Sequence, residues 1–242
     1  MLTQFANTTA APGVLRDDPV QAERSNYYDF GLEQTVSPGF TVGVDSYFKQ
    51  ATDLLDEGQF GAPIILTPFN YAHGQVYGIE LTGSYHAGGL TAYANLASQR
   101  AIGKDIISSE FNFDAAELAY IAGHYVHLDH EQQVTASAGI SYVWRGTRIS
   151  TDMLLGSGLR SDLTLPDGDS IPNGDRLPYY TQINVGLEHD FDRQGLSGLS
   201  ARVDIINLLD KVYEIRDGTG VGVGVPQFGA RRGLFLGVTE TF

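Results

Sequence analysis

The strongest constraint on the fold is a two-residue alternation of apolar and polar side chains that returns in nine separate segments. Successive side chains of an extended strand point to opposite faces, so this period gives each strand one apolar and one polar face. No segment shows a convincing helical stripe. The sequence therefore predicts an all-β protein, an antiparallel meander of about nine strands. The segments lie near 26–36, 40–50, 75–86, 90–99, 133–144, 147–156, 179–189 and 199–205, with a last one ending at Phe242.

The connections between these segments alternate strictly between short and long. Outer-membrane barrels have short periplasmic turns and longer extracellular loops, so the alternation is typical of a transmembrane β-barrel. If Phe242 ends at the periplasm, counting back places residues 1–25 on the extracellular side. The short connections are 37–39, 87–89, 145–146 and roughly 192–198, and the long ones are about 54–74, 103–130, 160–178 and 214–231.

A soluble β-sandwich also has alternating strands, but its loops need not alternate in length. Here the polar faces mix Gly, Ser, Thr, Asn and isolated charges, which suits a water-filled lumen. Large aromatic residues stand toward the strand ends, where an interfacial girdle would place them. The pattern favours a membrane barrel over a sandwich. The girdle candidates are Tyr28, Phe40, Phe48, Tyr85, Tyr142, Trp144 and Tyr179.

Composition excludes some classes of protein. The net charge of −14 argues against nucleic-acid binding, which requires a basic surface. No run of 18 apolar residues is present, so no transmembrane helix is expected. Residues 2–7 have neither the basic nor the apolar region of a signal peptide, so none is expected either.

The C-terminal end carries the most specific motif series. Asn207-Leu208-Leu209-Asp210-Lys211-Val212-Tyr213 is followed by a glycine-rich loop, by Arg231-Arg232-Gly233 and by an alternating strand that stops on Phe242. This tail resembles the C-terminal end of TonB-dependent outer-membrane receptors. The segments 57–61, 74–80, 128–132 and 156–160 are also similar to segments of that family, in the same order.

The resemblance implies that residues 1–242 are the C-terminal portion of a receptor barrel in the outer membrane of a Gram-negative bacterium. Barrels of this class have about 22 strands and a plugged lumen. The plug, the early strands and the energy-coupling segment are expected to be absent here, so that contact with the TonB complex would occur only through the missing plug. Other expected partners are outer-membrane lipid and a scarce nutrient: siderophore-bound iron, another metal chelate, a vitamin or an oligosaccharide. A passive porin or surface adhesin, and a soluble carbohydrate-binding sandwich, remain as alternatives.

Ligand recognition is expected on the long connections, because recognition groups are disproportionately carried on loops held by a rigid scaffold. The pattern contains no nucleophile elbow and no defensible carboxylate pair, so we expect no enzyme, no catalytic residue and no cofactor. The candidate ligand-binding side chains are Tyr71, His124, His127, Arg160, Arg216 and Arg231.

Two local patterns invite a metal-site interpretation. The first is His124, His127 and His130 with Asp129; imidazole can ligate metals, but three-residue spacing in a strand puts successive histidines on opposite faces. A solvated loop or a pH-sensitive contact is favoured there. The second is the acidic segment 167–175, which lacks the spacing of an EF-hand and indicates an exposed turn. We therefore expect no metal site.

Overall fold

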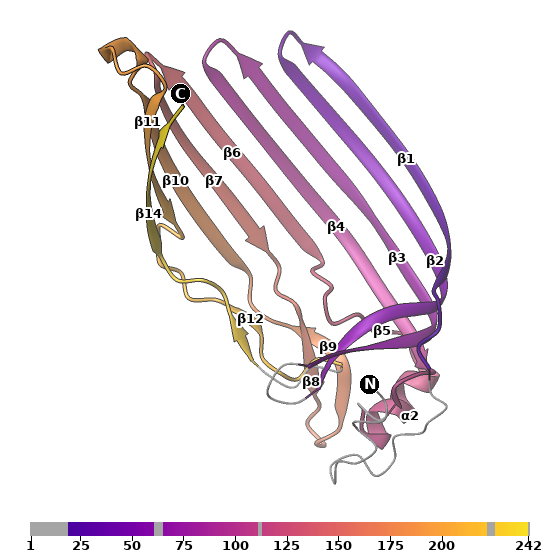
Figure 1. Cartoon of the computed structure of the whole chain (residues 1–242). Coiled ribbons are helices and arrows are strands. Elements are labelled where there is room, and N and C mark those ends of the chain that lie inside the picture. Colours follow the sequence, from indigo (N-terminus) through magenta and orange to yellow (C-terminus); the bar gives the residue numbers. More distant parts are fainter. Residues whose placement is uncertain (1–18, 61–64, 111–112, 222–225, 242) are drawn as a thin grey trace.

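The structure is a computed structural model that describes residues 19–60, 65–110, 113–221 and 226–241. Nine strands form one curved antiparallel sheet in which each strand pairs with its neighbours along the path β1-β2-β3-β4-β6-β7-β10-β11-β14 (Figure 1). The single sheet confirms the predicted meander and contradicts a two-sheet sandwich. The strands are β1 Arg24–Ser37, β2 Phe40–Phe60, β3 Ile65–Ala87, β4 Leu90–Ile106, β6 Val134–Trp144, β7 Thr147–Gly156, β10 Tyr180–Asp190, β11 Leu199–Ile206 and β14 Gly233–Glu240.

The short connections gather at one end of the sheet, together with the C-terminal end of the chain (Figure 1). The β6–β7 turn shows why two residues are enough: Arg145 and Gly146 have φ of 50° and 85°. Two successive positive φ angles match the twist of an antiparallel hairpin. The β10–β11 connection is longer and holds the one-turn helix η2, Asp192–Gln194. We call this the turn end, and the opposite end the loop end.

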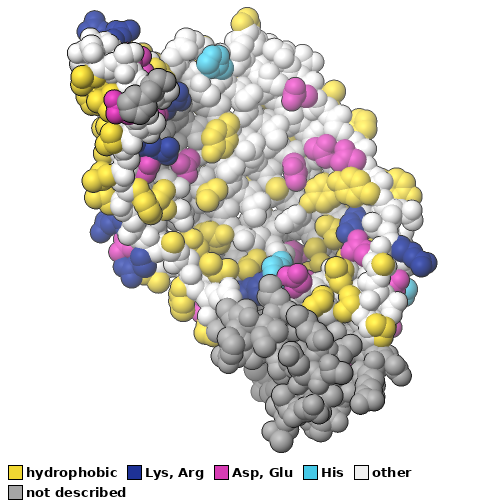
Figure 2. All heavy atoms as spheres, viewed as in Figure 1, with side chains coloured by type: hydrophobic (Ala, Val, Ile, Leu, Met, Phe, Trp, Pro, Cys, Tyr) yellow, Lys and Arg dark blue, Asp and Glu magenta, His cyan; other side chains and the backbone are white. Residues whose placement is uncertain are grey.

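Strand register divides the side chains into two faces, because directly paired residues point to the same side. Leu81 pairs with Val44 and with Leu96, and these apolar residues therefore share the outer face. On the inner face Asn184 Nδ2 donates to Asp152 Oδ2 at 2.6 Å, and Asn95 Nδ2 donates to Ser137 Oγ at 3.1 Å. In Figure 2, the backbone and side chains that are neither hydrophobic nor charged cover most of the visible sheet, with scattered hydrophobic and acidic side chains among them.

Aromatic side chains form two rows on the outer face. Tyr28, Phe48 and Tyr77 stand side by side on β1, β2 and β3, with ring centroids 6.5 and 6.4 Å apart. A second row near the turn end contains Phe40, paired with Tyr85. Tyr77 and Tyr85 are eight residues apart, which is about 27 Å along a strand and about 20 Å in height at a 40° tilt. The spacing suits the apolar band of an outer-membrane barrel.

The long connections are more ordered than the sequence predicts. The expected loop 54–74 is a continuation of β2 and β3, which pair as far as Phe60 and Ile65. Phe69 and Tyr71 remain in the strand pattern there, but both are fully buried rather than exposed on the outer face. The other long connections contain two small hairpins, a helix and a short strand. These are α2 Ala115–Gly123, β5 Val126–His127, β8 Arg160–Thr164, β9 Ser170–Arg176, β12 Glu214–Arg216 and β13 Gln227–Phe228.

The helix α2 corrects the expectation that the chain has no helical segment. The Asp114 side chain caps it by accepting from Glu117 N at 2.8 Å, and Ile121 is its one buried residue. A nine-residue helix with one buried position has too weak a periodicity to be recognised in the sequence. Among the described residues, no helix is long and apolar enough to cross a membrane.

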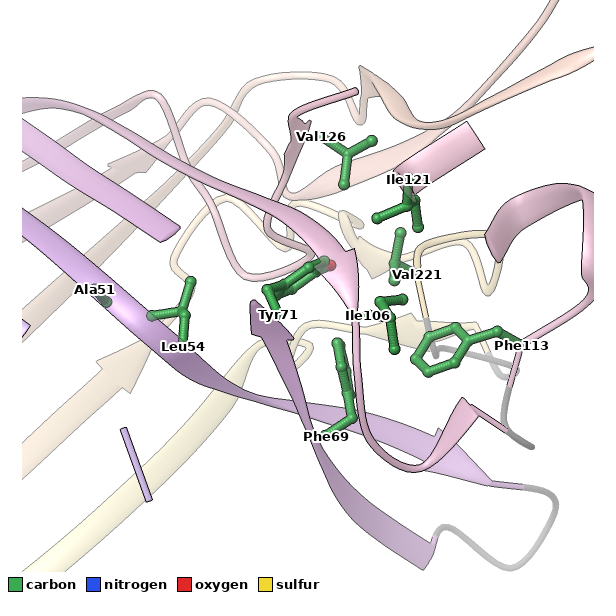
Figure 3. Packing of buried hydrophobic residues seen from close by; sticks show 9 residues of the cluster. All are labelled: Ala51, Leu54, Phe69, Tyr71, Ile106, Phe113, Ile121, Val126 and Val221. Carbon is green, nitrogen blue, oxygen red and sulfur yellow. The ribbon is translucent and has the colours of Figure 1, made fainter. Parts of the chain in front are cut away.

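The main cluster of buried apolar side chains lies at the loop end. Phe69 and Tyr71 of β3 meet Phe113 and Ile121 from the α2 region, with the Phe69 and Phe113 rings 4.9 Å apart (Figure 3). Gly103 of β4 is required beneath Tyr71, because a Cβ there would lie 2.6 Å from the Tyr71 ring. The loop end therefore has a small core of its own.

Candidate functional site

Three fully buried asparagines hold the connections of the loop end together. Asn70 Nδ2 donates to the carbonyls of Asp53 and Gln21, and its Oδ1 accepts from Ser108 Oγ. Asp53 has φ of 54°, in the left-handed region that is costly for residues other than glycine. The Asn70 amide thus stabilises an unusual backbone point in β2, from which the outer part of the β2–β3 hairpin crosses toward β8 and β12 (Figure 1).

Asn173 and Asn207 act in the same way at other connections. Asn173 of β9 donates from Nδ2 to the His127 carbonyl at 2.7 Å and accepts at Oδ1 from Val221 N at 2.9 Å. Asn207 donates from Nδ2 to the carbonyls of Lys211 and Ala230, both at 2.9 Å. Buried amides with their donors and acceptors satisfied fix specific loop arrangements.

A buried ion pair lies at the centre of the loop end. The Glu131 side chain is 0% exposed; its Oε1 accepts from Arg160 Nε at 3.2 Å, and Oε2 accepts from Ala101 N at 2.7 Å. His127 Nδ1 is 2.8 Å from the same Oε2. These hydrogen bonds and the Arg160 charge outweigh burial and lower the pKa of Glu131. Glu131 therefore stays ionised and connects β4, β5 and β8.

A second charged group lies beside the first. Arg216 Nη2 of β12 is 2.9 Å from Asp129 Oδ2 and also donates to His130 Nε2. His130 Nδ1 is 3.8 Å from Asp56 Oδ1, on the crossing part of β2. Neither oxygen of Asp129 has an aligned hydrogen-bond donor among the described residues, and the contact with Arg216 is an ion pair. The group joins residues from three connections.

Burial changes the protonation of this second group. It raises the pKa of Asp56 to about 7 and the pKa of Asp129 to about 6, the latter against the opposing charge of Arg216. Burial and Arg216 lower the pKa of His130. With a neutral His130 and partly protonated acids, the group can take up protons near neutral pH.

The structure brings four of the six predicted ligand residues together in the packed centre of the loop end. Arg160 and Arg216 are buried in ion pairs, and His127 is bonded to Glu131. Tyr71 is fully buried, and its hydroxyl has no hydrogen-bond partner among the described residues. In this arrangement, Tyr71 and the two arginines contact other protein groups rather than solvent.

The remaining two lie at the loop end but outside this packed centre. His124 is exposed at the end of α2, where its ring stacks on Tyr120 at 4.4 Å. Arg231 is exposed and donates from Nε to Asp210 Oδ1 at 2.8 Å, in the segment before β14. The three histidines of the 124–130 series have separate partners. In the part of the chain that the structure describes, no group of three His, Cys, Asp or Glu side chains converges as a metal site.

Sequence reasoning missed the acidic partners of the predicted residues. Glu131 and Asp129 belong to the segment 128–132, which resembles the receptor family, but the residues around them give no sign that the two acids are buried. Their arginines lie in other connections, Arg160 at a separation of 29 residues. The ordered β8–β9 and β12–β13 hairpins place those arginines, so only the assembled loop end reveals the pairs.

A curved antiparallel sheet with an apolar outer face, two aromatic rows and a packed loop end defines a segment of a transmembrane β-barrel. The family model described as "TonB dependent receptor-like, beta-barrel" matches residues 2–208. The chain therefore belongs to the β-barrel family of TonB-dependent receptors, proteins of the Gram-negative outer membrane. A comparison with curated protein sequences gives no significant match.

Solved structures support the fold. The FrpB iron transporter from Neisseria meningitidis is similar with a TM-score of 0.62 and 17% identity, over 92% of this chain and 32% of that one. The copper transporter OprC gives 0.63 and 16%, over 95% and 33%. The ferripyoverdine receptor of Pseudomonas aeruginosa, bound to ferripyoverdine, gives 0.59 and 12%, over 90% and 27%. The chain thus spans about a third of the length of these transporters.

Proposed function

We propose that this chain is the barrel segment of a receptor that takes up a scarce nutrient across the outer membrane, with energy from the TonB complex. The observation that carries the proposal is the family match over residues 2–208. The nutrient classes are siderophore-bound iron, another metal chelate, a vitamin or an oligosaccharide. Similar structures include transporters of iron and copper and a receptor for ferripyoverdine, which favours a metal or its chelate.

Ligand recognition is proposed for the loop end. His124 is exposed there and His127 is partly exposed, so both can meet a ligand directly. Tyr71, Arg160 and Arg216 are buried and would meet it only if the connections separate. Arg231 is exposed in the segment before β14 and belongs to the same proposal. The network of Glu131 and Asp129 would then set how readily the loop end opens.

The test is alanine substitution of these six residues, one at a time, in a complete receptor that carries this barrel segment. Uptake of radiolabelled iron as ferric siderophores, of copper and of cobalamin is measured against the surface amount of receptor. Loss of uptake per receptor for His124→Ala or His127→Ala supports direct recognition. Uptake that falls only in proportion to surface amount contradicts the site assignment. Uptake unaffected by removal of TonB contradicts energy coupling and favours a passive porin.

A further inference from the structure

The inner face of the sheet carries charge on both sides and none in its middle. Acidic residues occupy inward positions of β1, β2 and β3, and none of them forms an ion pair within the described part of the chain. They are Asp29, Glu33, Asp45 and Glu80. Acids and arginines share the inward positions of β7, β10 and β11. They include Arg148, Asp152, Glu188, Arg202 and Asp204.

The two strands between these sides are uncharged on the inner face. β4 and β6 have no Asp, Glu, Lys or Arg at an inward position from Thr91 to Ala101 or from Thr135 to Val143. We call these inward residues the neutral wall; most of them carry a hydroxyl, an amide or a small side chain. The Tyr93 ring lies across β6, since a Cβ at Gly139 would be 2.4 Å from it. Figure 2 shows the same division: acidic side chains gather over the side of β1 to β3, and the middle of the sheet carries mainly uncharged atoms.

Two hollows follow one another along the neutral wall. The one nearer the loop end, of about 390 Å³, is lined by Gln99 and Ala101 of β4 and by Asp56 of the crossing part of β2. The one nearer the middle of the sheet, of about 460 Å³, is lined by Ala97 of β4 and Ser137 of β6 among others. Ala97, Gln99 and Ala101 are successive inward residues of one strand, so the two hollows adjoin. Each has the volume of a small-molecule site.

Charged and uncharged walls differ in what they can hold. A barrel of this class encloses a plug, and a charge that the plug covers needs a partner of opposite sign on the plug. The acids of β1 to β3 and the mixed charges of β7 to β11 can therefore anchor a plug, whereas the neutral wall has no charge to anchor it.

The neutral wall suits a hydrophilic molecule that moves past it. Hydroxyl and amide side chains donate and accept hydrogen bonds, so they replace part of the water around such a molecule. Passage requires contacts that are favourable enough for entry and weak enough for release. Uncharged hydrogen-bonding groups meet both conditions, because they hold no ion of either sign in one place.

We propose that a water-filled passage runs along the neutral wall and that the nutrient crosses the barrel through it. The ligand class that fits is a hydrophilic molecule that presents hydroxyl, amide or metal-bound oxygen groups. The passage begins at the hollow beside the crossing part of the β2–β3 hairpin and continues past the hollow in the middle of the sheet. The proposal rests on the proposed uptake function and goes beyond it by assigning the strands that face the moving ligand.

The first experiment needs no ligand and uses a complete receptor that carries this barrel segment and has no other accessible cysteine. Asn95→Cys places a thiol on the neutral wall, and Glu33→Cys places one on the acidic side. Both positions are exposed, share one row of the sheet, and lie five and four residues from the turn end of their strands. They are three strands apart, about 14 Å. The other three acids of that side stay in place.

The rate of reaction with an uncharged, sugar-linked methanethiosulfonate is measured by mass spectrometry of the folded receptor. We expect Asn95→Cys to react about tenfold faster than Glu33→Cys, because a passage holds water and an anchored plug excludes it. Each rate is divided by that of the unfolded receptor, which removes differences in intrinsic thiol reactivity. Equal corrected rates, or a faster reaction at position 33, overturn the proposal.

The second experiment measures passage itself. Asn95→Trp narrows the passage, and Glu33→Trp is the matched control. Uptake and surface binding of radiolabelled ferric siderophores, copper and cobalamin are measured per receptor at the cell surface. We expect Asn95→Trp to lose about tenfold in uptake while its surface binding stays within about twofold of wild type. Glu33→Trp should keep both within about twofold. Equal uptake by the two variants overturns the proposal.

Failure of the passage and failure of the uptake function give different results. A wild type that takes up none of these probes contradicts the proposed uptake function, and the thiol rates then decide whether the passage exists. A wild type that takes up a probe, with equal uptake by the two tryptophan variants, contradicts the passage alone. Barrel assembly is followed by heat-modifiable electrophoretic mobility. If Asn95→Trp does not assemble, Ala97→Trp takes its place with the same expected result.

Discussion

At the residue scale, buried polar side chains determine the arrangement of the loop end. Glu131 has no solvent exposure, and Arg160 has 9%. Two charges withdrawn from water are tolerated only while they face each other and their other hydrogen bonds are satisfied. The Ala101 amide and His127 meet that requirement for Glu131. The arrangement of the loop end therefore depends on a few buried polar side chains, among them Glu131 and Arg160.

We expect Glu131→Gln to destabilise the loop end by about 3–5 kcal/mol, because the Arg160 charge would stay buried without a partner. The strands between the aromatic rows should keep their stability. Hydrogen exchange followed by mass spectrometry measures both regions. Glu188→Gln is the control, since Glu188 forms an exposed pair with Arg148 at 3.7 Å, worth about 0–1 kcal/mol. Equal protection of residues 157–177 in both variants would show that the buried pair is not structural.

At the element scale, the β2–β3 hairpin contributes both to the barrel wall and to the packed loop end. Its inner part, between the turn end and Asp53, belongs to the barrel wall. Its outer part, beyond Asp53, crosses the loop end and contributes Phe69, Tyr71 and Asp56. Periodicity predicted the inner part because one face meets lipid and the other water. It could not predict the outer part, where Phe69, Asn70 and Tyr71 are buried in succession. Asp53 and Asn70 mark the change, but a single non-glycine residue at positive φ has no sequence signature.

Asn70→Ala should release the outer part of this hairpin. The substitution removes the donor to the Asp53 and Gln21 carbonyls and the acceptor of the Ser108 hydroxyl hydrogen, and a buried polar group without a partner costs about 1–3 kcal/mol. Faster hydrogen exchange over residues 54–71, with little change between the aromatic rows, is the expected result. Asn95→Ala on the inner face serves as the control. Unchanged exchange over 54–71 in Asn70→Ala would contradict this role.

The contact between the hairpin and the segment 128–131 should depend on pH. Because the pKa of Asp56 is about 7 in the assembled loop end, against an ordinary 3.8, the assembled state binds a proton that the released state lacks. Its stability therefore falls as pH rises through 7. His130 acts in the opposite direction below its ordinary 6.5, because its pKa is lowered. In the Asp56→Asn variant, residue 56 cannot titrate but His130 is kept. Comparison with the wild type therefore separates the contribution of Asp56 from that of His130.

Relative to Asp56→Asn, the wild type should gain about tenfold in hydrogen-exchange protection of residues 54–71 from pH 8 to pH 6, after correction for intrinsic exchange. Asp167→Asn, in the exposed β8–β9 turn, should follow the wild type. A wild-type profile parallel to that of Asp56→Asn would show that Asp56 does not titrate in this range.

At the scale of the whole molecule, the sheet is one wall of a larger cylinder. With nine strands, β1 and β14 run in the same direction and cannot pair with each other in an antiparallel manner. A fully antiparallel barrel that contains this sheet needs an odd number of further strands. Thirteen would complete the 22 strands of outer-membrane transporter barrels. The strand number, the faces and the alternation of connections could be predicted because the bilayer imposes them along each strand. The contacts of the loop end join segments that are far apart in the sequence, so they could not be predicted from it.

Leu81 tests most directly whether the outer face lies in lipid. Leu81 stands midway between Tyr77 and Tyr85 on the outer face and is 46% exposed, while its neighbour Thr82 faces inward. An arginine on the lipid face at the bilayer midplane costs about 2–4 kcal/mol. In a complete receptor, Leu81→Arg should sharply reduce the heat-modifiable, membrane-assembled form, and Thr82→Arg should leave it near the wild-type amount. Equal assembly of the two variants would show that this face does not lie in lipid.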